Sequence, residues 1–517
     1  MSILNVENVN HGFGARKILE NTSFRLLKGE HVGLVGANGE GKSTFLNIIT
    51  GKLMPDEGKI SWCNRITTGY IDQYSTLTSG KTIRETLREA FSHLFNLEAE
   101  MLSLYEKMAD ASEDDVNKML LDVGDIGEML EQSGFYMIDS KISEFANGLG
   151  LSDIGLDRDV SELSGGQRAK VLLTKLLLQN PMILILDEPT NFLDENHIIW
   201  LKNFLQNYEN AFILVSHDIP FLNSVVNVIY HVENSILTRY TGDYNQFKEM
   251  YELKKTQLEQ AYKKQQREIA ELEDFIARNK ARVATANMAK SRQKKIDKMD
   301  IIELAKDKIK PSFIFKSART PGKLVITAEN LVIGYDSPLT SELDLTLERN
   351  QKVAIKGVNG LGKSTLLKTL LKITSSLSGK IEHDQFLKVC YFEQEAIESS
   401  KTALQEIWDE FPSMTNAEVR SALAKCGLTT EHITSQMKVL SGGENAKVRL
   451  CKIMLQECNL LVLDEPTNHL DVEAKEELKN AIQNFKGTVL LVSHEPEFYN
   501  EIATNIWDLE KWTTKIV

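Results

Sequence analysis

The chain has 517 residues, of which 42% are hydrophobic and 26% are charged, and its formal net charge is −13. This length predicts at least two domains with separate apolar cores, and the composition is that of a soluble globular protein. No run approaches the ~20 apolar residues of a membrane span, no secretory signal opens the chain, and the five cysteines form no C-x-x-C pair, so we expect a cytoplasmic protein with reduced thiols and no zinc site.

The first informative stretch along the chain links an apolar run, HVGLVG, to a helix-like segment, FLNIIT. It fits the pattern G-x-x-x-x-G-K-[ST], which counts as evidence only in such a strand–loop–helix setting. Its glycines let backbone N–H groups close around phosphate oxygens at a helix N-terminus. We expect Lys42 to reach the β- and γ-phosphates of ATP and Ser43 to hold Mg²⁺. The predicted nucleotide-binding residues are Gly36, Ala37, Asn38, Gly39, Glu40, Gly41, Lys42, Ser43 and Thr44.

A second copy of the pattern lies between KVAIKG and LLKTLL, in the same setting. Lys363 and Ser364 take the places of the phosphate-binding lysine and the Mg²⁺-holding serine. Two copies in matching context predict two ATP sites. The predicted residues of the second are Gly357, Val358, Asn359, Gly360, Leu361, Gly362, Lys363, Ser364 and Thr365.

The two halves of the chain repeat each other beyond these loops. Each carries, in the same order, a glutamine 31 residues after the loop lysine, then LSGG followed by Gln or Glu, then LDEPTN, then VSH. The repeat predicts a duplicated domain, near residues 1–240 and 323–517.

The spacing of the repeat breaks once. From Gln73 to Leu163 is 90 positions, whereas from Gln394 to Leu440 is 46, so the first half carries 44 additional residues. We place them at about 91–135, where an acidic sequence with helical periodicity predicts a helical hairpin arm. The alternative is a surface insertion without a role.

The segment between the halves, residues 241–322, is predicted to be a helical hairpin linker. Apolar and polar seam positions step by 4, 3, 4, 3 and 4 from Leu258 to Ile276, as on one face of a long helix. From Asp243 to Thr320 there are 19 Lys and Arg against 12 Asp and Glu, an excess of seven, which leaves −20 for the rest of the chain. A second helix is expected to run to about Lys310, before Pro311. A basic tip on an acidic body suggests contact with RNA, although a solvated charged face is the alternative; the candidate RNA contacts are Arg278, Lys280, Arg282, Lys290, Arg292, Lys294 and Lys295.

Paired acidic residues follow one apolar strand in each half. Phosphoryl transfer from ATP needs charge stabilisation and a positioned water. Asp187 and Asp464 end these strands, where a carboxylate can hold Mg²⁺ or its waters. Glu188 and Glu465 come next and are the candidate general bases for the attacking water.

Further residues recur at matching offsets in both halves, which argues against a purely structural role. Two glutamines are placed to sense Mg²⁺ and the attacking water, two histidines at strand ends to contact the γ-phosphate, and two aromatic residues to support the adenine ring. These residues are Gln73, Gln394, His217, His494, Phe13 and Tyr335. The LSGG stretches resemble glycine-rich helix starts suited to anions; they are Ser164, Gly165, Gly166, Gln167, Ser441, Gly442, Gly443 and Glu444.

With these motifs in order in both halves, the chain resembles an ABC-type ATPase pair. The resemblance implies an α/β fold of two P-loop ATPase domains in tandem, each with a helical subdomain, joined by the helical-hairpin linker. In that superfamily two such domains stack head to tail, and each ATP lies between the loop lysine of one and the LSGG serine of the other. This implies that Lys42 shares an ATP with Ser441 and Lys363 with Ser164. Asp194 and Asp471 would lie between the sites.

Within the superfamily the chain is similar to the ABC-F group of cytoplasmic, translation-associated ATPases. The duplicated ATPase halves, the lack of a membrane part, the arm and the basic linker with KSRQKK carry this resemblance. It implies a monomer that binds the ribosomal E site with its linker toward P-site tRNA and the peptidyl-transferase centre, in translation or in relief of stalled or antibiotic-blocked ribosomes. LSGGE in the second half and Phe13 in the first depart from the common pattern without removing a catalytic group. Asn191-Phe192 stands where the second half has Asn468-His469, which leaves equal use of the two sites open. The short C-terminus puts in doubt the contacts that some relatives make with a C-terminal tail.

Two other functions remain as alternatives. A transporter ATPase with a separate membrane partner would have no evident use for the basic linker. A DNA-repair or chromosome-associated ATPase would carry zinc modules or much longer coiled coils, and neither is present in the sequence.

Overall fold

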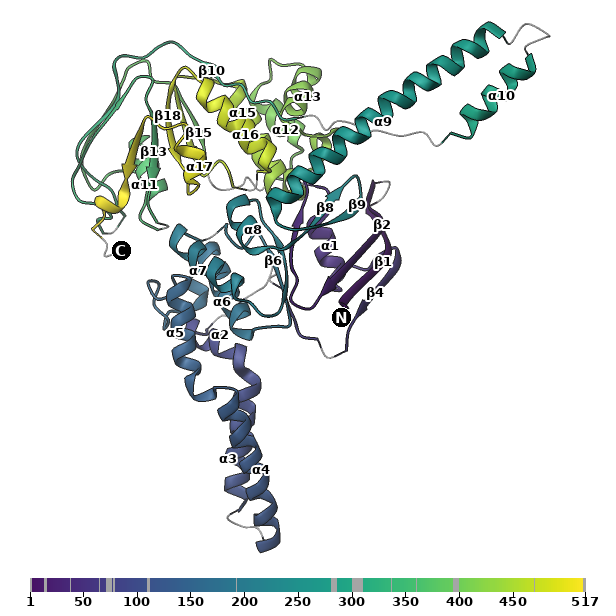
Figure 1. The fold of residues 1–517 in the computed structure, drawn as a ribbon. Helices are drawn as coiled ribbons and strands as arrows, with labels where there is room; N and C mark the ends of the chain where they lie inside the picture. The colour runs from purple at the N-terminus through teal and green to yellow at the C-terminus, as the bar shows by residue number, and fades with distance from the viewer. Residues whose placement is uncertain are drawn as a thin grey trace.

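The computed structural model describes residues 2–13, 16–37, 39–64, 66–70, 77, 80–108, 112–191, 193–279, 286–299, 310–335, 337–358, 360–393, 399–468 and 470–514. Two α/β bodies lie against each other, and two helical segments project from them (Figure 1).

The first body is built from strands and helices in the order of the chain. Its strands are β1 (Ser2–Phe13), β2 (Arg16–Leu27), β3 (His31–Val35), β4 (Glu57–Trp62), β5 (Thr68–Tyr70), β6 (Ile183–Asp187), β7 (Ala211–Val215), β8 (Val228–Glu233) and β9 (Ile236–Thr241). Its helices are α1 (Lys42–Ile49), α2 (Ile83–Arg88), α5 (Ile138–Gly148), α6 (Gly165–Gln179), α7 (Glu195–Gln206) and α8 (Ile219–Val225), with 3₁₀ turns at Glu89–Phe91, Phe135–Met137 and Val160–Glu162.

A six-stranded sheet in the order β5-β6-β7-β3-β8-β9 forms the centre of the first body, and a three-stranded antiparallel sheet, β2-β1-β4, packs beside it. All pairs in the central sheet are parallel except β8 with β9. Alternate residues of β6 enter different cores: Ile183 and Ile185 pack toward α1 and the antiparallel sheet, and Leu184 and Leu186 toward α5, α6 and α7. This two-sided burial explains why the strand is continuously apolar.

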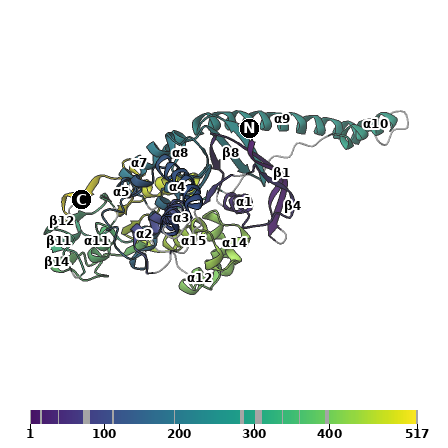
Figure 2. The same cartoon turned by 90° about the horizontal axis from the view of Figure 1, so that it is seen from below.

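Two helical projections leave the first body in different directions. Helices α3 (Ser92–Met108) and α4 (Glu113–Gln132) form the arm, and α9 (Tyr244–Asn279) and α10 (Ala286–Asp297) form the linker projection. Figure 2, a view from below, shows α9 and α10 extending sideways while α3 and α4 are seen nearly end-on. Helix α10 ends at Asp297, where Lys298 and Met299 form a turn closed by the Met299 N–H on the Ile296 carbonyl. The rest of the helix expected up to about Lys310 falls on residues 300–309, which lie outside the described part of the chain.

The second body repeats the first, with a central sheet of five strands instead of six. Its strands are β10 (Lys316–Ser317), β11 (Leu324–Val332), β12 (Leu343–Glu348), β13 (Lys352–Lys356), β14 (Ser378–His383), β15 (Val389–Phe392), β16 (Glu457–Cys458), β17 (Leu460–Asp464), β18 (Thr488–Val492) and β19 (Asn505–Asp508). Its helices are α11 (Lys363–Leu370), α12 (Ala403–Glu410), α13 (Asn416–Lys425), α14 (Thr430–Thr434), α15 (Gly442–Leu455), α16 (Val472–Asn484) and α17 (Pro496–Tyr499), with 3₁₀ turns at Met437–Val439 and Leu509–Lys511.

The central sheet of the second body is fully parallel, in the order β15-β17-β18-β13-β19, and β12-β11-β14 forms the antiparallel sheet. Strands β17 and β18 are buried along their whole length. In both bodies the loop before the first central helix (α1 or α11) and the acidic pair therefore leave the same edge of the sheet, where polar side chains can meet.

Within the described part of the chain, no helix combines the length and apolar character needed to cross a membrane.

Candidate nucleotide sites

The two phosphate-binding loops have the same backbone shape. Gly41 and Gly362 precede α1 and α11 with φ of 101° and 97°, a region that favours glycine. A Cβ added at Gly41 would lie 2.5 Å from Ile18 Cγ2, so a side chain does not fit there. Lys42 Nζ donates to the Gly36 carbonyl at 2.7 Å, and Lys363 Nζ to the Gly357 carbonyl at 2.8 Å. Each lysine ammonium thus lies over its own loop, where a phosphate oxygen could take the place of the carbonyl as hydrogen-bond acceptor.

Each loop serine lies next to the aspartate at the end of the neighbouring strand. Ser43 Oγ donates to Asp187 Oδ2 at 3.2 Å, and Ser364 hydrogen-bonds to Asp464. Asp464 Oδ1 is buried and has no hydrogen-bond partner among the described residues. A hydroxyl, a carboxylate and an unused buried oxygen fit Mg²⁺, which takes few protein ligands and completes its shell with phosphate oxygens and water. The described residues contain no cluster of three His, Cys, Asp or Glu that could hold a metal without such help.

The two candidate bases share a strained backbone. Glu188 and Glu465 both have φ of 51°, which is unusual for a residue with a side chain and is typical of functional sites. The backbone N–H of Glu188 donates to the Val215 carbonyl at 2.9 Å, and that of Glu465 to Val492 at 3.0 Å. These bonds tie each glutamate to the neighbouring strand and direct its side chain to the sheet edge.

The two histidines lie beside these glutamates. His217 Nε2 is 3.6 Å from Glu188 Oε1, and the His217 backbone N–H donates to Glu188 Oε2 at 3.2 Å. His494 Nε2 is closer to its partner, 2.9 Å from Glu465 Oε1, and also lies 2.9 Å from Lys363 Nζ. In the second site the histidine therefore contacts both the glutamate and the loop lysine.

Burial changes the protonation of the acidic residues. Burial and the adjacent charge of Asp187 raise the pKa of Glu188 to about 8. Burial raises the pKa of Asp464 to about 6, against the opposing hydrogen bond from Ser364. Burial also lowers the pKa of Lys42 and Lys363. Charged groups at these positions are costly until a ligand compensates them.

The raised pKa of Glu188 predicts a pH-dependent stability of the ligand-free protein. A carboxyl whose pKa rises from 4.5 to about 8 on folding stabilises the fold below pH 4.5, and this contribution is lost as the pH rises through 8. The melting temperature of Glu188→Gln relative to that of the unmodified chain should therefore increase from pH 5 to pH 9, by at least about 2 °C. Differential scanning calorimetry without nucleotide measures the gain. An identical difference at both pH values, or the same gain for the exposed control Glu131→Gln, would contradict the effect.

The LSGG stretches begin helices as expected. Ser164 caps α6 and Ser441 caps α15, and each forms a capping box with the residue three positions on. The Gln167 backbone N–H donates to Ser164 Oγ at 3.3 Å, and that of Glu444 to Ser441 Oγ at 3.4 Å. The second half has Glu444 where the first half has Gln167. The carboxylate of Glu444 lies 3.2 Å from His432 Nε2, so this glutamate has a histidine beside it.

Sequence reasoning missed two buried lysines in these helices. Lys447 Nζ lies 2.9 Å from Asp471 Oδ2, and Lys170 Nζ lies 3.6 Å from Asp194 Oδ2. Both lysines are 8% exposed. They connect the LSGG helix of each half to the aspartate that precedes α16 or α7. The signal was present in the sequence, because each lysine comes six positions after the LSGG serine.

The two aromatic residues lie at the surface. Phe13 ends β1 and is 57% exposed, with its ring edge-on to His11 at 5.0 Å, and Tyr335 is 64% exposed. An exposed ring is available to a flat ligand, as expected for an adenine platform.

Some predicted residues lie outside the described part of the chain: Asn38, Gln73, Lys280, Arg282, Asn359 and Gln394. The other basic candidates lie on the linker projection. Lys290, Arg292 and Lys294 are exposed, the Arg292 guanidinium lies 4.3 Å from the centre of the Phe275 ring, and Lys295 pairs with Glu268 at 2.7 Å. The contacts of Arg292 with Phe275 and of Lys295 with Glu268 hold α10 against α9.

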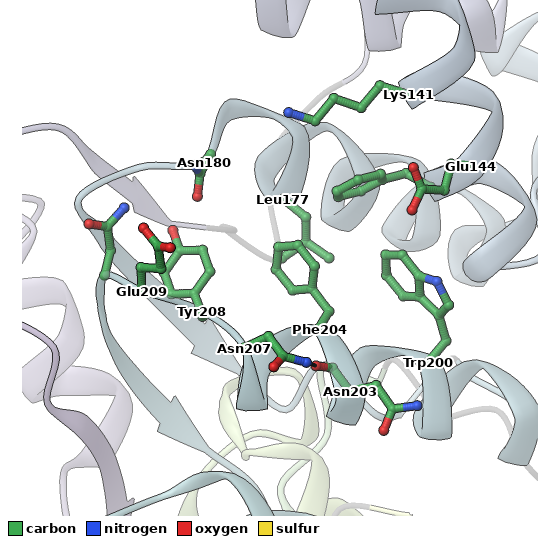
Figure 3. A pocket seen from close by; sticks show the side chains of 12 residues that line it. Lys141, Glu144, Leu177, Asn180, Trp200, Asn203, Phe204, Asn207, Tyr208 and Glu209 are labelled. Carbon is green, nitrogen blue, oxygen red and sulfur yellow. Dashed lines mark hydrogen bonds between the residues drawn. The ribbon is translucent and has the colours of Figure 1, made fainter.

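A separate groove of about 580 Å³ lies on the first body between α5, the end of α6 and α7 (Figure 3). Aromatic side chains form its wall: the Trp200 and Phe204 rings stack at 5.7 Å, and Phe145 meets Trp200 edge-on at 5.3 Å. None of its lining residues belongs to the predicted ATP sites. Its aromatic packing holds α7 against α5, and α7 begins next to Asp194.

The chain is similar in sequence and in fold to known proteins. A family model described as ABC transporter matches residues 19–191 and 340–468, and a second with the same description matches residues 230–315. The chain is 63% identical over 518 residues to the "Uncharacterized ABC transporter ATP-binding protein YfmM" of Bacillus subtilis (strain 168), covering 100% of both. It is 34% identical to "ABC transporter F family member 2" of Arabidopsis thaliana, over 97% of this chain and 75% of that one. A solved structure titled "Model of ribosome-bound archaeal Pelota and ABCE1" matches 96% of this chain and 75% of that chain, with a TM-score of 0.59 and 20% identity, and thus shares the fold.

Proposed function

This chain belongs to the F family of ABC proteins, with two ABC ATPase domains in tandem, and from that premise we propose that it is a cytoplasmic, Mg²⁺-dependent ATPase that acts on the ribosome. The observation that carries the ATPase assignment is the repeated geometry at the two sheet edges. In each half a loop lysine, a serine paired with an aspartate and a strained glutamate come together.

The residues of each site have different roles in ATP hydrolysis. The loop backbone and Lys42 or Lys363 bind the phosphates and offset their charge. Ser43 with Asp187, and Ser364 with Asp464, would hold Mg²⁺, which would supply positive charge to neutralise the charge that develops on the phosphate oxygens. Glu188 and Glu465 accept a proton from the attacking water, and the histidine beside each glutamate orients that glutamate.

Three observations support the ribosome as the target. A relative is named for the F family, and a structure with the same fold is titled as ribosome-bound. The linker segment also carries an excess of seven positive charges on an otherwise acidic chain, which suits a polyanionic RNA surface. In our proposal the protein binds the E site as a monomer, and the linker reaches toward P-site tRNA and the peptidyl-transferase centre, to regulate translation or to relieve stalled or antibiotic-blocked ribosomes.

Sedimentation of a hydrolysis-deficient variant tests this proposal. With ATP, Glu188→Gln/Glu465→Gln should migrate with ribosomes on a sucrose gradient, because closed ATP-bound halves persist on the target. Without ATP the protein should stay at the top of the gradient. Lys42→Ala/Lys363→Ala, which lacks the phosphate-binding amines, should stay at the top under both conditions.

The opposite outcome is equally informative. ATP-loaded protein that never migrates with ribosomes contradicts the ribosomal role. Its recovery with membranes instead would favour the alternative, an ATPase subunit of a transporter with a separate membrane partner.

A further inference from the structure

A histidine joins two capping boxes in the second half. Thr429 caps α14 and Ser441 caps α15, and in both helices the residue three positions on turns its side chain back to the cap. The Thr429 backbone N–H donates to His432 Nδ1 at 3.4 Å, and the Ser441 backbone N–H donates to Glu444 Oε2 at 2.9 Å. His432 Nε2 lies 3.2 Å from Glu444 Oε1, so the two boxes meet through these side chains.

The hydrogen bonds of the imidazole determine which of its nitrogens carries the proton. Because Nδ1 of His432 accepts the Thr429 N–H, the proton of the neutral ring is on Nε2, the nitrogen next to Glu444. The side chains of His432 and Glu444 are only 13% and 12% exposed, which strengthens the attraction between the N–H group and the carboxylate. Glu444 thus uses one oxygen for Ser441 and has the other beside His432.

The first half forms the same box without a charge. Gln167 is the matching residue there, and its Oε1 accepts the Ser164 N–H at 3.0 Å. Nine positions before Ser164 stands Gly155, whereas His432 stands nine positions before Ser441 (164 − 155 and 441 − 432). A neutral amide completes the first box with no side chain at this position, so the histidine accompanies the carboxylate.

A carboxylate at the start of α15 needs such a partner. The LSGG stretch is a predicted nucleotide contact, and the phosphates of ATP would repel the charge of Glu444. The Glu444 backbone N–H donates to Ser441 Oγ at 3.4 Å, which leaves the hydroxyl its own proton to donate to a phosphate oxygen. Displacement of the Glu444 side chain would open the capping box and release the Ser441 backbone that the box holds.

We propose that His432 is a positioning residue for the second LSGG stretch, where its imidazole holds the Glu444 carboxylate in the capping box and so keeps Ser441 in place to bind ATP. This role rests on the proposed ATPase function. The first LSGG stretch needs no such residue, because Gln167 carries no charge.

A histidine that only supported the fold would respond differently to substitution. His432 also completes the box of α14, whose Ile433 is buried in the core of the second body. His432→Glu separates the two roles. A glutamate at this position of a capping box can still accept the Thr429 N–H, but its charge repels Glu444.

ATP hydrolysis in a double-mutant cycle tests the proposal. The background is Glu465→Gln, which keeps Glu188, the base of the site that Ser441 completes in the arrangement implied for ABC ATPases. There His432→Glu should lower kcat/KM for ATP about fivefold or more, a coupling typical of side chains in contact. When Glu444→Gln is also present, the same change should alter kcat/KM by less than about twofold, because the repulsion is gone. ADP affinity should stay the same, since ADP depends on the phosphate-binding loop.

Thr430→Glu is the matched control. It adds the same negative charge at the exposed first position of α14 and should leave kcat/KM unchanged. If Glu465→Gln is inactive while the unmodified chain hydrolyses ATP, the cycle is run in the unmodified chain, where kcat/KM should fall in the same variant.

Equal loss with and without Glu444→Gln would show that His432 only supports the fold. That result, or no loss in either case, would overturn its role in positioning Ser441 and leave the ATPase assignment intact. If the unmodified chain itself lacks hydrolysis, the proposed function fails and this inference fails with it.

Discussion

Glu188→Gln combined with Glu465→Gln should lower the rate of ATP hydrolysis by about 100-fold or more, the usual size of a lost general base. The amide has the shape of the carboxylate but cannot accept the proton of the attacking water. Its carbonyl can still accept the bond that the His217 N–H donates at 3.2 Å, so the backbone should keep its shape. Phosphate release at saturating ATP measures the loss, and retention of labelled ATP on a filter checks that binding persists.

The control for this variant is Glu128→Gln/Glu131→Gln, the same change of charge on the exposed arm helix α4. It should hydrolyse ATP at the unmodified rate. If the site variant keeps more than about a tenth of the activity, the two glutamates are not the bases.

Lys42→Ala combined with Lys363→Ala should weaken ATP binding by about 10- to 100-fold, which corresponds to losing a charged hydrogen bond at each site. In the ligand-free protein these lysines are 8% and 7% exposed and donate to loop carbonyls. Their removal also removes a buried charge, so the melting temperature without ATP should not fall. Titration with a fluorescent ATP analogue gives the affinity, and thermal melting with and without ATP gives the stabilisation by ligand.

Lys52→Ala/Lys372→Ala provides the comparison, because each of these exposed lysines comes shortly after the end of α1 or α11. This control should bind ATP normally. A site variant that melts well below the unmodified chain without ATP would show that the lysines support the fold, and unchanged ATP affinity would remove them from the site.

Much of the architecture follows from local features of the sequence. The tandem α/β ATPase fold was predicted correctly, because a glycine pattern such as Gly36 to Thr44 is needed wherever a strand turns sharply into a helix around phosphate. The apolar runs before Asp187 and Asp464 were likewise predicted to be strands, and β6 and β17 lie there. The end of α10 at Asp297 was not predicted, because helix ends depend on turn contacts that periodicity does not report.

The site required the tertiary structure wherever distant groups meet. Ser43 and Asp187 lie far apart in the chain and within 3.2 Å in space, and the positive φ of Glu188 and Glu465 follows from the strand beside each one. The burial that raises the pKa of Glu188 is also not evident from local patterns. The sequence by itself determined which residues can bind phosphate, because steric freedom and charge belong to each residue. Packing alone decided which of them share a site and how charged they are, because desolvation and electrostatic attraction depend on neighbours brought together by folding.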